Sequence, residues 1–421
     1  MTMGLIPPPL RNDCFAMPQG ADWTPVDTAL AHLRANLQPV TGVEGIALSA
    51  ARGRILAGPA IALRPHPPAA NAAVDGYALA GPVPEGAHQL PLAKGRAAAG
   101  EPFPATVPGG HALRILTGAD MPDGTDTVIL QEDVTTDGQH IAFHGPLKAG
   151  ANRRKVGEDI AKGQVLFSAG HRLTVADLAT LASVGVGKIN VRKRLRVGVL
   201  STGSELVEAG RIAAPGQIYD ANRPMLCATL RGWGYAVRDL GIVPDDRATI
   251  RATLDQAADD CDVILTSGGA SAGDEDHMSA LLADTGSFAL WRIAMKPGRP
   301  LAMGLWQGKP VFGLPGNPVA AFVCALIFAR PALAVLAGEP WPTPLVYLLP
   351  AAFEKTKKPG RREYLRARIT SDSHVDIFTS EGSGRVSGLS WATGLVELPD
   401  AAATIRPGDP VRFLPFADMG V

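Results

Sequence analysis

The sequence predicts a multidomain α/β protein, and three observations support this fold class. Its 421 residues exceed what a single hydrophobic core usually supports. Between residues 195 and 338, short apolar runs alternate with amphipathic helical patterns, which is typical of a doubly wound α/β domain whose parallel sheet is covered by helices on both faces. The segments 63–162 and 339–421 instead contain short apolar runs separated by glycine and proline turns. They predict a β-rich insertion domain and a C-terminal all-β domain.

The remaining segments, 20–62 and 163–194, predict a small helical and mixed domain that the β-rich segment interrupts. Residues 24–37 carry a capping threonine, a proline at the first helical position and one apolar stripe, which together predict a helix. A second helix is expected to begin at the capping Thr174. We expect both helices to belong to this one discontinuous domain.

Within residues 195–338, the apolar pattern defines each element in turn. We expect strands at 194–203, 235–246, 261–269 and 309–318, and helices at 222–234, 245–260, 276–286 and 319–329. The last helix is the longest apolar run, but it is too short to cross a bilayer of about 30 Å. We therefore expect it to be buried.

The composition narrows the class of protein. Forty basic residues balance forty acidic ones and aromatic residues make up 5% of the chain, so we expect neither nucleic acid nor a membrane as a partner. The four cysteines are far apart and form no C-x-x-C pair, which suits free thiols in a reducing compartment. The first residues lack the pattern of a signal peptide, and we expect a cytoplasmic protein.

Polar loops follow the expected strands at one edge of the α/β sheet. Ligands of open α/β sheets bind beyond the carboxyl ends of the strands. The loops 201–205, 244–246, 266–276 and 314–318 all lie at this edge and carry glycine, hydroxyl or carboxylate groups. This convergence predicts a ligand site without depending on any single motif.

One of these loops contains Gly269-Ala-Ser-Ala-Gly273, the G-x-S-x-G pattern of a serine hydrolase. Three carboxylates follow directly, and one carboxylate about 6 Å away, at an effective dielectric of about 20, costs an oxyanion roughly 3 kcal/mol. Acyl transfer needs the opposite charge. We therefore interpret Gly268, Gly269 and Ser271 as part of a glycine-rich loop that lets the backbone approach a phosphorylated ligand.

Carboxylates from three of the loops indicate a metal site. Glu205, Asp245 and Asp276 follow neighbouring strands, and clustered carboxylates repel one another unless a cation lies among them. Oxygen ligands favour Mg²⁺, which commonly bridges to phosphate. The alternative is a solvated acidic rim whose members never meet.

Cations and a helix start indicate a site for an oxyanion such as phosphate. Asn317 is a good N-cap and Pro318 a good first helical residue, so we expect free N–H groups of this helix to face the loop. Lys296 and Arg299 flank a Pro-Gly turn, and Arg292 comes four residues before Lys296. The alternative is an ordinary, well-formed helix start.

Three polar residues of the β-rich segment lie in expected turns. They are Asp75, which precedes a glycine, Thr117, which follows a strand, and Asp159, which follows a basic stretch. Taken singly, each is typical of an ordinary surface turn.

Eight motifs occur in order along the chain: NAAVDGYA, ILTGADMPDGTDTVILQED, GANRRKVGEDI, LSTGSEL, GQIYDANR, TSGGASAGDED, AMKPGRP and GLPGNPVAA. Together they resemble the molybdopterin molybdenumtransferase family, the molybdenum-insertion enzymes of molybdenum-cofactor biosynthesis, which is related to the C-terminal domain of gephyrin. The resemblance implies that the α/β domain is molybdopterin-binding-like. It also implies a homodimer, with the active site between this domain of one subunit and the β-rich insertion of the other.

The resemblance further implies a reaction of adenylylated molybdopterin with molybdate, promoted by Mg²⁺, in which AMP leaves. The metal ligands would be Glu205, Asp245 and Asp276. The residues implied in catalysis are Asp75, Thr117, Asp159, Glu205, Asp245, Asp276 and Lys296. Those implied in substrate binding are Ser201, Thr202, Gly203, Gly268, Gly269, Ser271, Arg292, Pro297, Arg299, Pro315, Gly316, Asn317, Arg366 and Ser383.

Three positions depart from the family pattern. Arg292 and Arg299 stand where relatives commonly carry lysine, and arginine keeps the charge but presents it as a planar fork. Ala320 stands where serine is common, which removes a hydroxyl beside the expected oxyanion site.

Two other functions stay open. A molybdopterin adenylyltransferase shares the α/β domain, but such enzymes are typically that domain alone. A non-catalytic scaffold of the gephyrin type would need no acidic site, whereas this chain keeps the acidic positions. An adenylyltransferase is also a possible partner of an enzyme that consumes its product.

Overall fold

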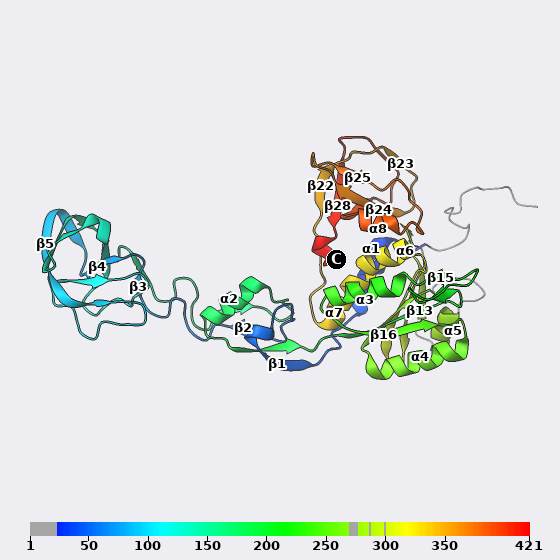
Figure 1. Cartoon of the computed structure of the whole chain (residues 1–421), viewed down its shortest axis with the longest axis horizontal. Coiled ribbons are helices and arrows are strands. Elements are labelled where there is room, and N and C mark those ends of the chain that lie inside the picture. The colour runs from blue at the N-terminus through cyan, green and yellow to red at the C-terminus, as the bar shows by residue number, and fades with distance from the viewer. Residues whose placement is uncertain (1–22, 269–276, 286–287, 299) are drawn as a thin grey trace, which may run out of the picture. The chain divides into compact units, whose positions relative to one another are not determined.

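The computed structural model describes residues 23–268, 277–285, 288–298 and 300–421. These residues fall into two compact units (Figure 1). One unit is Val43–Arg192, and the other comprises the chain before Val43 and after Arg192. The multidomain α/β class expected from the sequence is confirmed, because the second unit contains a helix-covered sheet followed by a β domain.

The sheet of the α/β domain has six strands in the order β16-β13-β17-β21-β20-β18. Four of them run parallel, as the alternating pattern predicted: β13 (Arg196–Thr202), β16 (Ala236–Val243), β17 (Val263–Ser267) and β21 (Lys309–Leu314). All of β17 and nearly all of β13 is buried. Continuous burial is expected of strands that helices cover on both faces.

Helices cover both faces of this sheet. α4 (Arg247–Asp260) and α5 (His277–Asp284) pack together on one face, and α3 (Asn222–Gly232) packs on the other beside α6 (Pro318–Cys324) (Figure 1). The apolar stripe of α4 shares one buried core with α5 and the strands beneath them.

Two strands of this sheet were not expected from the sequence. β18 (Phe288–Arg292) and β20 (Pro300–Trp306) are antiparallel to their neighbours. β20 joins β21 through Gln307 and Gly308, whose φ angles of 48° and 77° are both positive. A two-residue turn of this kind reverses the chain. The sheet is therefore mixed: the expected parallel pairing holds for β16, β13, β17 and β21, and two antiparallel strands extend it at one edge.

A long helical segment follows β21. It consists of α6, a π-helical stretch (Ala325–Ala329) and α7 (Arg330–Ala337), and it ends at Gly338 with φ 99°. Within the described part of the chain it is the one helix whose length and composition would allow it to cross a membrane, so it is longer than the expected 319–329 helix. Because 89% of its apolar window is buried inside the protein, we interpret it as a core helix, as expected.

The first helix, α1 (Val26–Asn36), belongs to a different compact unit from the second helix, α2 (Val175–Ser183). Its buried stripe faces α7. Thr24 does not cap α1; its N–H donates to the carbonyl of Arg292 at 2.9 Å, as part of a bridge to the α/β domain. The structure thus places α1 in the unit of the α/β domain, because its apolar face is buried there.

In the other unit, the β-rich part is a six-stranded sheet in the order β7-β4-β6-β5-β9-β8. β4 (Gly76–Leu79) is wholly buried between β6 (Ala112–Ile115) and β7 (Thr127–Leu130). A Cβ at Gly76 would lie only 1.8 Å from the carbonyl oxygen of Ile129, so this close strand contact requires glycine. The remaining strands are β5 (Val83–Ala97), β8 (Thr135–Thr136) and β9 (His140–Leu147).

The rest of this unit combines α2 with short paired strands. α2 begins with a capping box, in which Thr174 Oγ1 accepts the N–H of Asp177 at 3.3 Å and the Asp177 carboxylate accepts the N–H of Thr174 at 2.7 Å. The helix start expected at Thr174 is confirmed. The pairs are β1 (Val43–Ala47) with β12 (Lys188–Arg192), β2 (Ala60–Ile61) with β11 (Val165–Phe167), and β3 (Asn71–Ala72) with β10 (Arg153–Arg154).

Replacing Thr174 with alanine is expected to lower the free energy of unfolding by about 1 kcal/mol, because the cap on the Asp177 N–H is lost. Urea unfolding followed by circular dichroism measures this change. Thr180→Ala is the matched control, since Thr180 lies inside the same helix, where alanine is the better helix former. Equal midpoints for the two variants would contradict the role of the cap.

The C-terminal domain is built on a sheet in the order β19-β24-β26-β28-β22. β24 (Arg362–Ile369) lies between β26 (Gly394–Leu398) and β19 (Met295–Lys296). β19 comes from the preceding α/β segment, so the two domains share a sheet. The other elements are β22 (Tyr347–Pro350), β23 (Lys355–Lys357), β25 (Val375–Ile377), β27 (Ala403–Ile405), β28 (Pro410–Pro415) and one short helix, α8 (Ser387–Trp391). That helix is an addition to the expected all-β domain.

Candidate functional site

A cleft of about 320 Å³ opens at the carboxyl edge of the α/β sheet. β13 and β17 are neighbours there, and β16, which follows β13 in sequence, lies on the other side of β13. Open α/β sheets bind ligands at such a reversal of strand order. The cleft is lined by Thr202, Glu205, Leu206, Ile218, Tyr219, Asp220, Ala221, Asn222, Ser267, Gly268, Gly316, Asn317 and Pro318.

Two glycines bring the backbone of three strand ends together at this cleft. Gly268 has φ 89°, and a Cβ there would lie 2.5 Å from the carbonyl oxygen of Thr202. Its N–H donates to the carbonyl of Leu314 at 3.2 Å. A Cβ on Gly316 would meet the Cα of Gly268 at 3.9 Å. The glycines expected at this edge therefore leave backbone, rather than side chains, facing a ligand.

Three buried polar atoms at this edge have no hydrogen-bond partner in the described part of the chain: Ser201 Oγ, Thr202 Oγ1 and Asn222 Oδ1. Asn222 Nδ2 donates to the Gly316 carbonyl and to Ser267 Oγ, both at 2.6 Å. A carbonyl only accepts, so the amide nitrogen must face Gly316 and Oδ1 is the group left for another donor. Buried polar groups are normally paired. Two of these three residues, Thr202 and Asn222, line the cleft, where a polar ligand could supply the missing partners.

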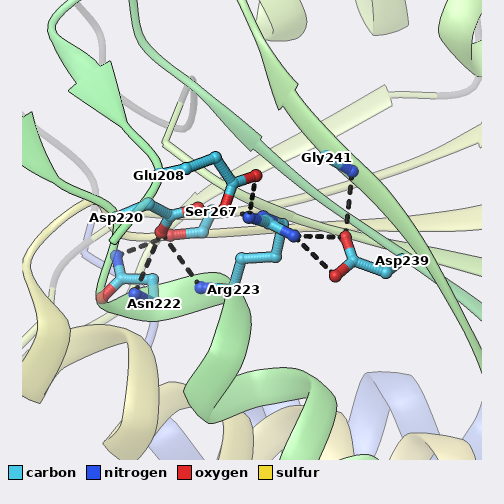
Figure 2. Close-up of polar contacts among 7 residues, drawn as sticks. All are labelled: Glu208, Asp220, Asn222, Arg223, Asp239, Gly241 and Ser267. Carbon is cyan, nitrogen blue, oxygen red and sulfur yellow. Dashed lines mark hydrogen bonds and ion pairs between the residues drawn. The ribbon is translucent and has the colours of Figure 1, made fainter. Parts of the chain in front are cut away.

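Arg223 fixes the wall of the cleft beside Asn222 (Figure 2). Its guanidinium contacts Asp220 at 3.1 Å, Asp239 at 2.5 Å and Glu208 at 2.5 Å. Burial opposes the charged form, but these carboxylates outweigh it and raise the pKa of Arg223 above its ordinary value. Asp220 also accepts the N–H groups of Asn222 and Arg223, both at 3.1 Å, at the start of α3.

The motif GQIYDANR is recognisable in the sequence, but no role was predicted for its residues Asp220, Asn222 and Arg223. A signal was present, because an aspartate two residues before a helix commonly accepts the first free N–H groups. Nothing in the sequence indicated that the arginine is buried among three carboxylates. That information comes from tertiary packing.

Glu205 and Asp245 lie in loops that leave the neighbouring strands β13 and β16. Ser204 joins the loops, since its N–H donates to Asp245 Oδ2 and its Oγ accepts the N–H of Asp245, both at 3.1 Å. A Cβ on Gly203 would lie 2.7 Å from Glu205 Oε2, so the glycine allows this carboxylate to fold back over the loop. Two carboxylates at adjacent strand ends fit the oxygen preference of Mg²⁺.

The third expected metal ligand, Asp276, lies outside the described residues, as do Gly269, Ser271 and Arg299. Among the residues that the structure does describe, no group of three His, Cys, Asp or Glu side chains is arranged to hold a metal ion. The proposed three-carboxylate set therefore stays a prediction.

Two of the expected cationic residues lie near the C-terminal domain. Lys296 is half-buried in β19, opposite Glu363 of β24, and its ammonium pairs with Glu381. Arg292 is exposed at the end of β18. The buried Pro297 follows Lys296. The loop then packs directly on α6, because a Cβ at Gly298 would lie 2.8 Å from Cys324 Sγ.

The start of α6 differs from the expected oxyanion site. Pro318 has no N–H, Val319 N–H donates to the carbonyl of Ser383 at 3.2 Å, and Ala321 N–H donates to the carbonyl of Asn317 at 2.8 Å. The Asn317 side chain makes no capping hydrogen bond. The expectation that several free N–H groups face the loop was wrong, because a loop of the C-terminal domain is bonded to this helix start.

Arg366 holds that loop in place. The residue is 4% exposed, and its guanidinium donates to the carbonyls of Arg385 at 2.5 Å, Gly382 at 3.2 Å and Ser380. Burial lowers its pKa. Because these carbonyls flank Ser383, the contacts show Arg366 positioning the loop; a contact with substrate stays a prediction.

In the β-rich insertion, the structure brings Asp75 and Thr117 together. Asp75 Oδ1 accepts the N–H of Thr117 at 2.7 Å and its hydroxyl at 2.8 Å. These two bonds, with a smaller contribution from Arg114, lower the pKa of Asp75. Asp159 bonds elsewhere, since its N–H donates to the carbonyl of His66 at 3.1 Å. Two turns that look ordinary in the sequence therefore form one hydrogen-bonded pair, in which the Asp75 carboxylate carries a negative charge.

The doubly wound sheet and its polar cleft define a ligand-binding domain of the molybdopterin-binding class. The family described as "Probable molybdopterin binding domain" matches residues 198–335. The MoeA N-terminal region (domain I and II) matches residues 24–185, and the MoeA C-terminal region (domain IV) matches residues 349–416.

The chain belongs to the molybdopterin molybdenumtransferase (MoeA) family. It is 35% identical to a molybdopterin molybdenumtransferase of Haemophilus influenzae, over 93% of this chain and 98% of that one. It is 33% identical to molybdopterin molybdenumtransferase 2 of Mycobacterium tuberculosis, over 90% and 95% of the two chains. The crystal structure of a molybdopterin biosynthesis MoeA protein from Pyrococcus horikoshii OT3 superposes with a TM-score of 0.82 at 27% identity, covering 94% of this chain and all of that one.

Proposed function

We propose that this protein transfers molybdenum from molybdate into adenylylated molybdopterin and releases AMP. Relatives that carry the name of this transferase align with this chain over nearly their whole length. The single observation that carries the proposal is the cleft at the strand reversal, where Thr202 Oγ1 and Asn222 Oδ1 are buried without partners. A polar, phosphorylated heterocycle supplies the donors and acceptors that such atoms need.

In this proposal the adenylylated pterin lies in the cleft, with its phosphates against the backbone of Gly268 and Gly316. Glu205 and Asp245, together with Asp276, would hold Mg²⁺. When bound, this ion would neutralise charge on the phosphoanhydride as AMP leaves. The pair of hydrogen bonds between Ser204 and Asp245 keeps the two metal-binding loops together.

Molybdate is proposed to bind beside Lys296. The side chain of Lys296 is only 16% exposed and its backbone pairs with β24, so water screens the charge of the ammonium poorly. Arg292 and Arg299 are proposed to add positive charge, and Arg366 to hold the loop of Ser383 beside the oxyanion.

We further propose that the protein is a homodimer and that the partner subunit supplies Asp75, Thr117 and Asp159 to the site. Asp75 is held ionised by its two bonds from Thr117, which suits a group that orients a cation or a donor. A cytoplasmic location and docking of an adenylyltransferase, which would make the adenylylated substrate, complete the proposal.

The test is to incubate the protein with adenylylated molybdopterin, Mg²⁺ and molybdate, and to measure AMP release together with molybdenum bound to the pterin. Molybdenum insertion with release of AMP supports the transferase. Consumption of ATP with free molybdopterin would instead indicate an adenylyltransferase, and no turnover of either kind would indicate a scaffold.

Asp276→Ala is expected to abolish AMP release, because it removes one of the three proposed metal ligands. The dimer, measured by light scattering, should persist. Undiminished AMP release from this variant would overturn the assignment of Asp276 to the metal.

A further inference from the structure

One carboxylate, that of Glu381, is shared by two lysines. Its Oε2 contacts the ammonium of Lys296 and its Oε1 contacts that of Lys355. The lysine side chains are only 16% and 11% exposed, whereas that of Glu381 is 39% exposed. Lys355 also lies 3.4 Å from Glu363. The cluster of two lysines and two glutamates is therefore neutral as a whole.

The loop that carries Glu381 is anchored on both sides of this residue. Arg366 bonds to the carbonyls of Ser380 and Gly382, which flank Glu381 in sequence. The carbonyl of Ser383 accepts the N–H of Val319 at the start of α6. The backbone on both sides of Glu381 is thus held in place, which keeps its carboxylate within reach of Lys296.

Among the residues that the structure describes, the space beside Lys296 is too small for an oxyanion. The cavity there, which Lys296, Pro297, Val319, Arg366 and Glu381 help to line, has a volume of about 20 Å³. A cavity of this size accommodates about one water molecule. A tetrahedral oxyanion that contacts the Lys296 ammonium from this cavity must therefore displace the Glu381 side chain.

We infer that Glu381 is an internal competitor for Lys296 that selects doubly charged oxyanions over singly charged ones. The inference rests on the proposed function, in which molybdate binds beside Lys296. A singly charged anion offers Lys296 no more charge than the Glu381 carboxylate already supplies, so it gains nothing by displacing it. A dianion offers twice the charge, and the displaced carboxylate keeps Lys355 as a partner.

Two substitutions with opposite expected effects test this inference. Glu381→Gln keeps the size of the side chain but removes the competing charge, so molybdate affinity should rise roughly tenfold. Chloride, which should barely affect molybdate binding to the unaltered protein, should become an effective competitor. Lys355→Met removes the second partner of Glu381, leaves the carboxylate to Lys296 alone, and should weaken molybdate binding.

The measurement is isothermal titration of molybdate into each full-length protein at low and high chloride, with circular dichroism to check folding. If the contacts of Glu381 only stabilised the structure, both variants would bind molybdate more weakly. Unchanged or weaker binding of molybdate by Glu381→Gln therefore overturns the inference. AMP release by the unaltered protein separates this failure from that of the proposed function. If AMP is released but the molybdate affinities of the two variants do not change in opposite directions, only the role of Glu381 is overturned. If no AMP is released, the proposed function fails, and the inference fails with it.

Discussion

Replacing Asp245 with asparagine is expected to slow AMP release by about 10²–10³-fold, because it removes one negative charge from the proposed Mg²⁺ site. The substitution is nearly isosteric. The amide oxygen of asparagine can still accept the N–H of Ser204, and the backbone N–H of residue 245 can still donate to Ser204 Oγ. The loop should therefore keep its shape, and the loss should be one of charge at the site.

The neighbouring residue provides a matched control. Asp246 caps α4, with its carboxylate accepting the N–H of Thr249 at 2.8 Å. Asparagine is as good a cap as aspartate, so Asp246→Asn should change neither stability nor turnover appreciably. AMP release is measured for both variants across a range of Mg²⁺ concentrations. Equal rates for the two variants would remove Asp245 from the metal site.

The largest loss of stability is expected from Arg223→Met, at about 3–5 kcal/mol of unfolding free energy, which is typical when one partner of a buried ion pair is removed. The guanidinium is buried and is the common partner of Asp220, Asp239 and Glu208 (Figure 2). Methionine fills much of the same volume but leaves the nearly buried Asp220 carboxylate without its cation.

Arg238→Met is the control for this prediction. Arg238 pairs with Asp260 where both side chains are more than 40% exposed, and exposed pairs contribute about 0–1 kcal/mol. In urea unfolding, the loss of unfolding free energy should therefore be several-fold larger for Arg223→Met than for Arg238→Met. A loss below about 1 kcal/mol for Arg223→Met would mean that the network does not stabilise the fold.

The Arg223 substitution should also affect the cleft. Asp220, which Arg223 holds, accepts the N–H of Asn222, and Asn222 lines the cleft. Stability and ligand binding are therefore linked through one buried side chain.

Much of the fold follows from local pattern. The apolar runs located β13, β16, β17 and β21, and the capping residue Thr174 located the start of α2. These elements could be predicted because burial on both faces imposes a continuous apolar run on a strand, and because a cap acts within one turn of the chain. The alternation of strands with helices was then sufficient to place the polar loops at one edge of the sheet.

The candidate site could be predicted only in part. The sequence placed Thr202, Glu205 and Gly268 at that edge because the carboxyl ends of parallel strands must meet there. It missed Asn222 and Arg223, whose importance comes from what surrounds them and not from their type. It also predicted free N–H groups at the start of α6, because it contained no sign of the loop that bonds there.

By itself, then, the sequence determined the class of fold, the polar edge of the sheet and the family to which the chain belongs. These depend on short-range periodicity and on motifs whose residues are close together in the chain. Only the tertiary structure decided that α1 joins the α/β unit, that Asp75 accepts two bonds from Thr117, and that Glu381 is shared by Lys296 and Lys355. Each of these joins residues more than twenty positions apart, and such pairings depend on how the whole chain buries its apolar surface and pairs its charges.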